Sequence, residues 1–155
     1  MMQRNRAARW RVCIVTDRKT LVDMLGRVAF FEGLSKKELE AVVRSSSEVD
    51  HSAGKAVVQE GRDGVGFHLI LSGSATVTQR GRKLRTIGVG ESFGDIALID
   101  GGPRSATVTA DTPLHTLSVT SWDFRPLLYE HPQIAYKLLL QLCGRLRDAE
   151  KRPPL

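Results

Sequence analysis

The residues that could do chemistry gather within positions 93–105. Gly94 follows an extended run, and a glycine there lets the backbone approach a ligand closely. Asp95 can begin a short helical turn, whose first amides lack intrahelical partners and favour an anion. Arg104 returns to the start of this turn after a Gly-Gly-Pro reversal, and the hydroxyl of Ser105 lies beside it. Amides, a guanidinium and a hydroxyl together predict a phosphate-binding pocket.

Asp95 must have a different role in such a pocket, because a carboxylate cannot help to hold a phosphate. It suits a sugar hydroxyl, which acidic residues bind in other nucleotide sites. A phosphate clamp beside a hydroxyl acceptor predicts a compact phosphorylated sugar as the ligand. The alternative is a degenerate pocket in which Asp95 and Arg104 pair with each other.

The chain around this pocket is predicted to form β structure. Eleven of the 14 glycines fall between residues 54 and 102, and short β-rich runs lie among and after them. These runs cover residues 56–59, 67–71, 75–79, 83–87, 106–110 and 114–119. Short strands separated by turn residues predict a sandwich, roll or barrel, and the lack of strand–helix alternation argues against a doubly wound fold.

Helical patterns flank the β-rich region. Residues 17–47 have helical spacing, interrupted near Phe30, and Ser35 with Glu38 forms a capping box. The predicted fold class is therefore α+β, mainly β, with a β-roll between N- and C-terminal helices. We expect a basic arm at 1–16, one domain at 17–151 and a tail at 152–155. Within the domain, we expect a helical segment at 17–47, a roll at 48–119 and C-terminal helices at 121–151.

The C-terminal helices have clear start signals. Ser121 can begin a short helix that runs through Tyr129, and Pro132 suits the first position of a last helix that ends near residue 151. Apolar residues follow at three- and four-residue steps, and we interpret the stripe of leucines 138, 142 and 146 as core or as a dimer seam.

Composition narrows the class of protein. The 155 residues are 41% hydrophobic and 26% charged, and no apolar stretch approaches the length of a membrane span. Cys13 and Cys143 lie too far apart in sequence for metal-ligand spacing. The net charge of +6 comes mainly from residues 1–27, which carry seven basic and two acidic side chains. This arm could dock on an acidic protein, a membrane surface or nucleic acid, or it is simply solvated.

The sequence resembles the cyclic nucleotide-binding domain family, which includes the catabolite activator and the regulatory subunits of protein kinase A. The resemblance is carried by Phe-Gly-Asp-Ile-Ala-Leu at 93–98 and Pro-Arg-Ser-Ala-Thr-Val at 103–108, which are similar to the family's phosphate-binding cassette. Segments 30–35, 60–73 and 124–132 also resemble the family, in the same order. The resemblance covers about residues 20–150 and implies a jelly-roll-like β-roll.

The resemblance implies roles for the cassette residues. Arg104 would pair with the exocyclic phosphate of a cyclic nucleotide, and the backbone amides of Ile96 and Ala97 would share that phosphate. Ser105 would add a hydroxyl, either to the phosphate or to a purine edge. Gly94 would let the backbone pass beneath the ribose.

Two positions need separate comment. Asp95 takes the place of the family's glutamate, which holds the ribose 2′-hydroxyl, and its side chain is one methylene shorter. Because Asp95 reaches less far, we expect it to bind the 2′-hydroxyl through a water molecule or to bind it more weakly. Arg145 resembles an arginine that lies near the ligand in bacterial relatives, so it is a candidate base contact or lid.

The resemblance implies a sensor, not an enzyme, that binds cAMP, with cGMP as the second candidate ligand, and that needs no metal or other cofactor. Output would pass by repositioned helices to a partner protein or a second copy, and we expect a cytoplasmic protein. No helix-turn-helix follows the last helix, which argues against direct sequence-specific DNA binding. The alternatives are a non-binding scaffold of the same fold and a cupin-type enzyme, against which the scattered histidines argue.

Overall fold

The computed structural model of the chain describes residues 16–64 and 66–151. Nearly all of the expected basic arm, the expected tail and Cys13 lie outside these residues. The elements, in chain order, are α1 (Arg18–Gly26), the 3₁₀ turn η2 (Ala29–Phe31), α2 (Lys36–Arg44), β1 (Ser47–His51), β2 (Ala56–Val58), β3 (Gly66–Ser72), β4 (Ala75–Gln79), β5 (Arg82–Ile87), β6 (Ser92–Phe93), α3 (Asp95–Asp100), β7 (Thr107–Ala110), β8 (Leu114–Thr120), α4 (Ser121–Glu130) and α5 (Pro132–Glu150).

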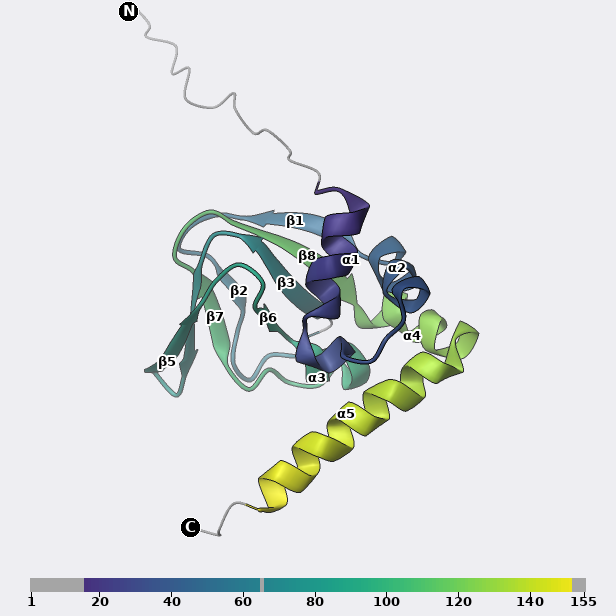
Figure 1. The fold of residues 1–155 in the computed structure, drawn as a ribbon. Coiled ribbons are helices and arrows are strands. Elements are labelled where there is room, and N and C mark those ends of the chain that lie inside the picture. Colours follow the sequence, from purple (N-terminus) through teal and green to yellow (C-terminus); the bar gives the residue numbers. More distant parts are fainter. Residues whose placement is uncertain (1–15, 65, 152–155) are drawn as a thin grey trace, which may run out of the picture.

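The strands form two antiparallel sheets of four strands each, with the orders β1-β8-β3-β6 and β2-β7-β4-β5. The first sheet lies between the helices and the second sheet (Figure 1). On β3, Phe67 and Leu69 point into a core shared with the helices, whereas Ile70 joins a smaller core between the two sheets. Successive side chains of a strand point to opposite faces of its sheet, so β3 contributes to both cores.

The α+β class and the β-roll flanked by helices are confirmed. The expectation of a mainly β fold needs adjustment, because more of the described residues lie in helices than in strands. α5 alone runs for 19 residues. No helix within residues 16–64 and 66–151 is both long and apolar enough to cross a bilayer.

The predicted start signals are found in the helices. Ser35 and Glu38 make both hydrogen bonds of the capping box: Ser35 N donates to Glu38 Oε1 (2.8 Å) and Glu38 N donates to Ser35 Oγ (3.2 Å). Pro132 is the first residue of α5. The hydroxyl of Thr120, rather than that of Ser121, caps α4 by accepting from the backbone N–H of Asp123.

Two strands lie outside the β-rich runs predicted from the sequence. β1 is largely polar and exposed because it lies at a sheet edge, so it lacks the apolar alternation that signals a strand. β6 is only two residues long and follows a glycine-rich turn. β1 therefore carries no pattern that the sequence alone could reveal, whereas β6 agrees with the extended run expected just before Gly94.

Candidate functional site

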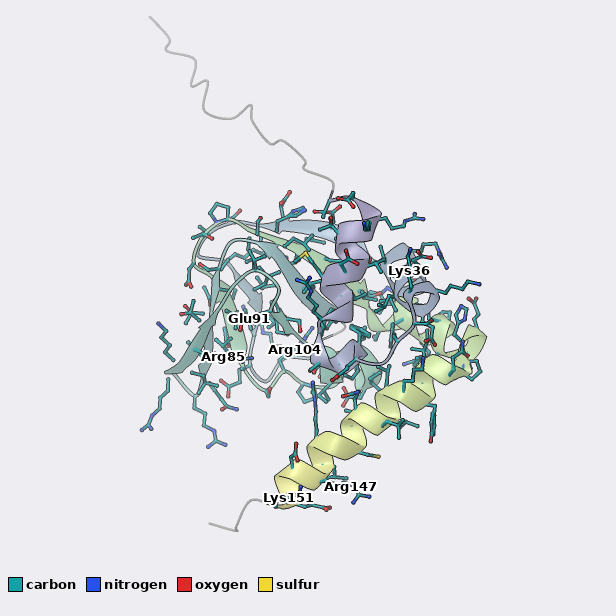
Figure 2. The ribbon with its side chains drawn as sticks, in the orientation of Figure 1. Lys36, Arg85, Glu91, Arg104, Arg147 and Lys151 are labelled. Atoms are coloured by element: carbon teal, nitrogen blue, oxygen red, sulfur yellow. The ribbon has the colours of Figure 1, made fainter. Side chains whose placement is uncertain are left out.

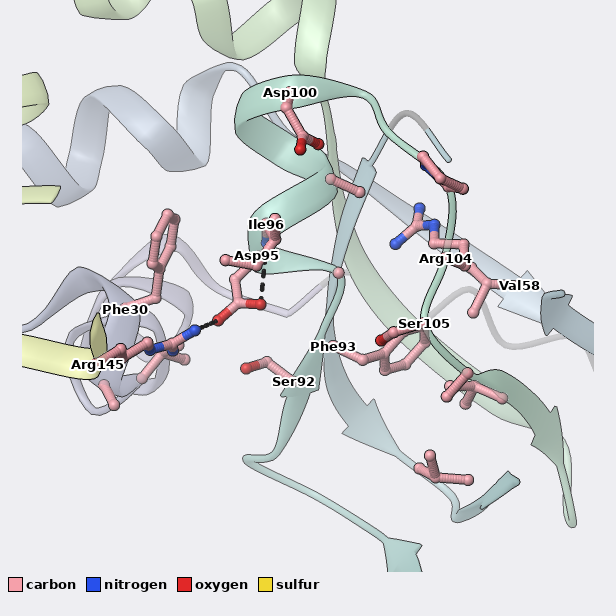
Figure 3. A pocket seen from close by; sticks show the side chains of 18 of the residues that line it. Phe30, Val58, Ser92, Phe93, Asp95, Ile96, Asp100, Arg104, Ser105 and Arg145 are labelled. Atoms are coloured by element: carbon pink, nitrogen blue, oxygen red, sulfur yellow. Dashed lines mark hydrogen bonds and ion pairs between the residues drawn. The ribbon is translucent and has the colours of Figure 1, made fainter. Parts of the chain in front are cut away.

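A cavity of about 610 Å³ opens beside the junction of β6 and α3. Its walls come from η2, the inner face of the second sheet, the loop before β7 and the C-terminal half of α5. All seven predicted site residues line this one cavity: Gly94, Asp95, Ile96, Ala97, Arg104, Ser105 and Arg145. In Figure 3, Arg104 and Ser105 lie on one side of it, and Asp95 and Arg145 on the other.

Arg104 is the unusual residue of the cavity, because only 9% of its surface is exposed. Its Nη2 donates a hydrogen bond to the carbonyl oxygen of Gly66 (2.7 Å). The other two nitrogens, Nε and Nη1, are buried and have no partner among the described residues. Burial lowers the pKa of the guanidinium, but an arginine remains a cation in proteins. Such a group is costly unless an anion pairs with it.

Two glycines make room for this arginine. A Cβ on Gly64 would lie 1.6 Å from Arg104 Nε, and a Cβ on Gly94 would lie 2.3 Å from Nη1. Gly94 also has a φ of +87°, which favours glycine. The predicted close backbone approach at Gly94 is therefore made to the Arg104 side chain and to the carbonyl of Gly66. Gly64 was not among the predicted site residues, because its importance depends on a side chain forty positions later.

Asp95 has two partners. Its Oδ1 accepts from the backbone N–H of Ile96 (3.0 Å), and its Oδ2 lies 2.6 Å from Nη1 of Arg145. The guanidinium carbon of Arg145 also lies 5.8 Å from the centre of the Phe30 ring. The carboxylate therefore pairs with Arg145 rather than with Arg104, unlike the degenerate pocket considered above. The amide of Ile96, expected to face a ligand freely, is already used by this carboxylate.

The remaining cassette residues keep their backbone polar groups near the cavity. Ala97 lies in the first turn of α3, whose N-cap is Gly94 and has no side-chain hydrogen bond. Ser105 is exposed, and its carbonyl accepts from Nε2 of Gln79 (3.0 Å). The Ser105 hydroxyl lies on the same side of the cavity as Arg104 (Figure 3).

A largely buried histidine, His68, packs behind the wall that contains Arg104. His68 stacks on the cavity residue Phe93, with 4.9 Å between ring centres, and its Nδ1 lies 2.8 Å from the hydroxyl oxygen of Ser118. Burial, together with the charge of Arg104, lowers the pKa of His68 to about 3. The ring is therefore neutral, and it packs against Phe93. Within the described residues, no group of three or more His, Cys, Asp or Glu side chains is arranged to hold a metal ion.

The comparisons with known proteins agree with this geometry. The profile of the cyclic nucleotide-binding domain matches residues 48–131. The chain belongs to the cyclic nucleotide-binding domain family. Among relatives of this domain, a CRP-like cAMP-activated global transcriptional regulator from Mycobacterium tuberculosis is 29% identical over 130 residues, covering 81% of this chain and 58% of the regulator. A cAMP-dependent protein kinase regulatory subunit from Yarrowia lipolytica is 33% identical over 132 residues, which cover 77% of this chain and 35% of the subunit.

A solved structure has the same fold. It is the N-terminal domain of a transcriptional regulator from Streptomyces coelicolor A3(2), with a TM-score of 0.75 and 31% identity. The match covers 83% of this chain and 92% of that domain. This cyclic nucleotide-binding domain thus spans little more than half of the Mycobacterium regulator, and about a third of the Yarrowia subunit.

Proposed function

We propose that the chain is a regulatory module that binds a cyclic nucleotide, with cAMP as the leading ligand and cGMP as the second candidate. The observation that carries this proposal is Arg104, a buried cation with two unpaired nitrogens beside the start of α3. A cyclic phosphate is an anion that would satisfy both nitrogens through charge-assisted hydrogen bonds. The two curated relatives described above are cAMP proteins by name, which supports cAMP. We propose that the module binds this ligand in the cytoplasm without transforming it.

The other cassette residues take their places around the phosphate and ribose. The amides of Ile96 and Ala97 would share the phosphate with Arg104, and Ser105 would add its hydroxyl. Gly94 would lie beneath the ribose, and Asp95 would accept from the 2′-hydroxyl. Because the amide of Ile96 already donates to Asp95 Oδ1 (3.0 Å), phosphate binding requires this carboxylate to turn away.

That turn provides a route from ligand to helix. Asp95 holds the C-terminal half of α5 through its ion pair with Arg145, of which 46% of the side chain is exposed. The N-terminal half of α5 is held separately by buried Ile134 and Leu138 and by an ion pair of 2.6 Å between Lys137 and Glu38. When the phosphate accepts the hydrogen bond from the amide of Ile96, the carboxylate of Asp95 turns away. This movement weakens the Asp95–Arg145 ion pair and releases the C-terminal half of α5. Nucleotide thus shifts the population between two positions of this half-helix.

Output would then pass through the outer face of α5, which we define as Tyr136, Leu139, Leu140, Cys143 and Leu146. These side chains are exposed, the four large ones by 53–64%. They lie opposite the residues that face the body of the domain. A second copy of the chain presenting the same face is the proposed partner, because an exposed apolar stripe at coiled-coil spacing is self-complementary.

The scaffold alternative has less support. A pocket that had lost its ligand would have no need to keep a buried, partly unpaired guanidinium in a space made by two glycines. Replacing such a charge by an apolar side chain would remove its desolvation cost.

Hydrogen–deuterium exchange with and without cAMP tests the proposal. We expect slower exchange at residues 93–98 and faster exchange at residues 145–151 when nucleotide is added, and neither change in Arg104→Ala. Arg145→Ala should show the faster exchange of the helix end without nucleotide. Arg147→Ala, two positions along the same helix, should not, because Arg147 makes none of the ion pairs of the described residues. Unchanged exchange after addition of either cyclic nucleotide would favour the scaffold.

A further inference from the structure

A histidine on β8 contacts two carboxylates of the neighbouring edge strand β1. The Nδ1 atom of His115 lies 2.6 Å from Oδ1 of Asp50, and its Nε2 atom lies 2.9 Å from Oε1 of Glu48. His115 and Asp50 are directly paired in the strand register, and Glu48 is two residues before Asp50, so the three side chains share one face of the sheet. None of the three lines the cavity that contains Arg104, which Figure 2 shows near α3, away from β1. The cluster is therefore separate from the proposed nucleotide site.

Both contacts can be hydrogen bonds only when the ring of His115 carries two protons. A neutral imidazole has one N–H donor and one acceptor nitrogen, whereas an imidazolium donates from both nitrogens. Because ionised carboxylates only accept, a neutral ring would turn one lone pair toward a carboxylate and lose that hydrogen bond. Burial lowers the pKa of His115, but the hydrogen bonds and charges of Glu48 and Asp50 raise it by more, so that it lies above the ordinary value of 6.5. The folded protein therefore holds a proton here more tightly than the unfolded chain does.

The other groups around His115 leave its charge to the two carboxylates. β3, on the far side of β8, places the non-titrating residue Ser72 opposite His115. His51 lies on the other face of β1, and burial lowers its pKa, so it is neutral near pH 7. Asp17, at the start of α1, is bound instead to Thr20. A second cavity of about 410 Å³, lined in part by His115 itself, lets protons exchange between the ring and solvent.

Glu48 links this cluster to the N-terminal helix. Its Oε1 atom accepts from the backbone N–H of Thr16 (3.1 Å) as well as from His115. Thr16 directly precedes Asp17, the N-cap of α1. β1 lies at the edge of its sheet and pairs with β8 alone among the described strands. One protonated ring therefore stabilises both the edge strand and the segment that leads into α1.

We propose that His115 is a pH-sensitive latch that holds β1 and the start of α1 against β8 while its ring is protonated. When the proton leaves for solvent, the ring keeps one N–H and loses one of its two hydrogen bonds, and its charge no longer offsets the two carboxylates. β1 can then loosen without disturbing the rest of the sheet, because it is an edge strand. The stabilisation is complete below about pH 6.5 and is lost as pH rises through the higher pKa of the folded protein.

Two measurements on the full chain test the latch. NMR titration of the histidine ring resonances should give His115 a midpoint above pH 6.5. Hydrogen–deuterium exchange, corrected for the intrinsic effect of pH, should show protection at residues 16–21 and 47–51 that falls with the same midpoint. We expect a loss of roughly tenfold between pH 6 and pH 9, about the contribution of one charged hydrogen bond.

Three variants separate the latch from other effects of pH. Asp50→Asn should fold, because the Asp50 side chain is 63% exposed, and it should lower the His115 midpoint toward pH 6.5 and reduce the loss of protection. His115→Gln should have low protection at both pH values, because glutamine does not titrate. His131→Gln is the matched control and should retain the wild-type pH dependence, because His131 belongs to none of the ion pairs of the described residues.

A His115 midpoint at or below pH 6.5, or one that is unchanged in Asp50→Asn, would overturn the latch. So would protection at residues 16–21 and 47–51 that does not change with pH, or a pH dependence that persists in His115→Gln. None of these outcomes bears on nucleotide binding through Arg104, which is measured separately.

Discussion

Arg104 owes its position to residues that have no side chain. Gly64 and Gly94 leave the space that its guanidinium occupies, and the carbonyl of Gly66 accepts one of its hydrogen bonds. The cost of burying the cation is offset only in part by that hydrogen bond, since two nitrogens stay unpaired among the described residues. Binding of an anion would supply the missing partners.

Gly64→Ala should therefore weaken nucleotide binding with little loss of stability. The backbone of Gly64 does not have a positive φ, so alanine is tolerated there, but its Cβ would lie 1.6 Å from Arg104 Nε and displace the side chain. We expect at least a roughly tenfold loss of affinity in a titration with cAMP, about the loss of one charged hydrogen bond. Gly88→Ala is the control, because its nearest neighbour would be 3.9 Å away. Wild-type affinity in Gly64→Ala would show that the observed position of Arg104 is not needed.

His68 makes the stability of the protein depend on pH. Its pKa of about 3 lies below the ordinary value of 6.5 because the ring is buried beside Arg104. Below pH 6.5 the unfolded chain binds a proton at His68 that the folded chain does not bind. Stability is therefore lost as pH falls from about 6.5 toward 3.

Urea denaturation at pH 7 and pH 4.5 measures this effect. Protonation of His68 in the unfolded chain should reduce the free energy of unfolding by about 2–3 kcal/mol between these pH values, because each pH unit below the unfolded pKa costs about 1.4 kcal/mol. His68→Phe should show a pH-induced loss that is smaller by this amount, because it retains stacking on Phe93 without a titratable ring. Identical pH dependence in both proteins would mean that His68 is not held neutral.

The helix α5 has two faces with different partners. On the inner face, Ile134 and Leu138 are buried against the body of the domain. Two ion pairs also hold this face, one between Lys137 and Glu38 and one between Arg145 and Asp95. Burial raises the pKa of Glu38, whereas the hydrogen bonds from Lys137 and Ser35 lower it. The resulting pKa lies below the ordinary value for a glutamate. The outer face is apolar and exposed, and the predicted stripe divides: Leu138 is core, whereas Leu146 is 61% exposed.

Leu139→Glu should therefore disrupt self-association through the outer face of α5. A charge placed in an apolar interface is costly to bury. Sedimentation velocity over a concentration series should show a dimer for wild type and a monomer for Leu139→Glu. Leu84→Glu is the matched control, because Leu84 on β5 is exposed by 56%, compared with 57% for Leu139. A wild-type monomer at all concentrations, or a dimer that persists in Leu139→Glu, would rule out this interface.

The elements that sequence could predict are those with a local signal. The capping box of α2, the proline that begins α5 and the cassette over 93–108 are each encoded within a few neighbouring residues. The polar edge strand β1 has no such signal. The ion pair of Asp95 with Arg145 was not predicted either, because it depends on how α5 crosses the cavity fifty residues later.

The whole domain places its cavity where its parts meet. The second sheet supplies the floor, the cassette supplies the side that contains Arg104, and α5 supplies a wall through Arg145. A ligand in this cavity would therefore contact the roll and act on the Asp95–Arg145 pair that holds α5. Binding should also stabilise the folded protein in proportion to the logarithm of ligand concentration, since the unfolded chain has no such site.

Calorimetric titration of cAMP and cGMP into wild type and Arg104→Ala, at one fixed salt concentration, tests this proposal most directly. We expect micromolar or tighter binding of at least one nucleotide to wild type. We expect a loss of about a hundredfold or more in Arg104→Ala, since charged hydrogen bonds contribute about 1.5–3 kcal/mol each. The absence of heat with both nucleotides on folded wild-type protein, or unchanged binding in Arg104→Ala, would contradict a nucleotide sensor that depends on this arginine.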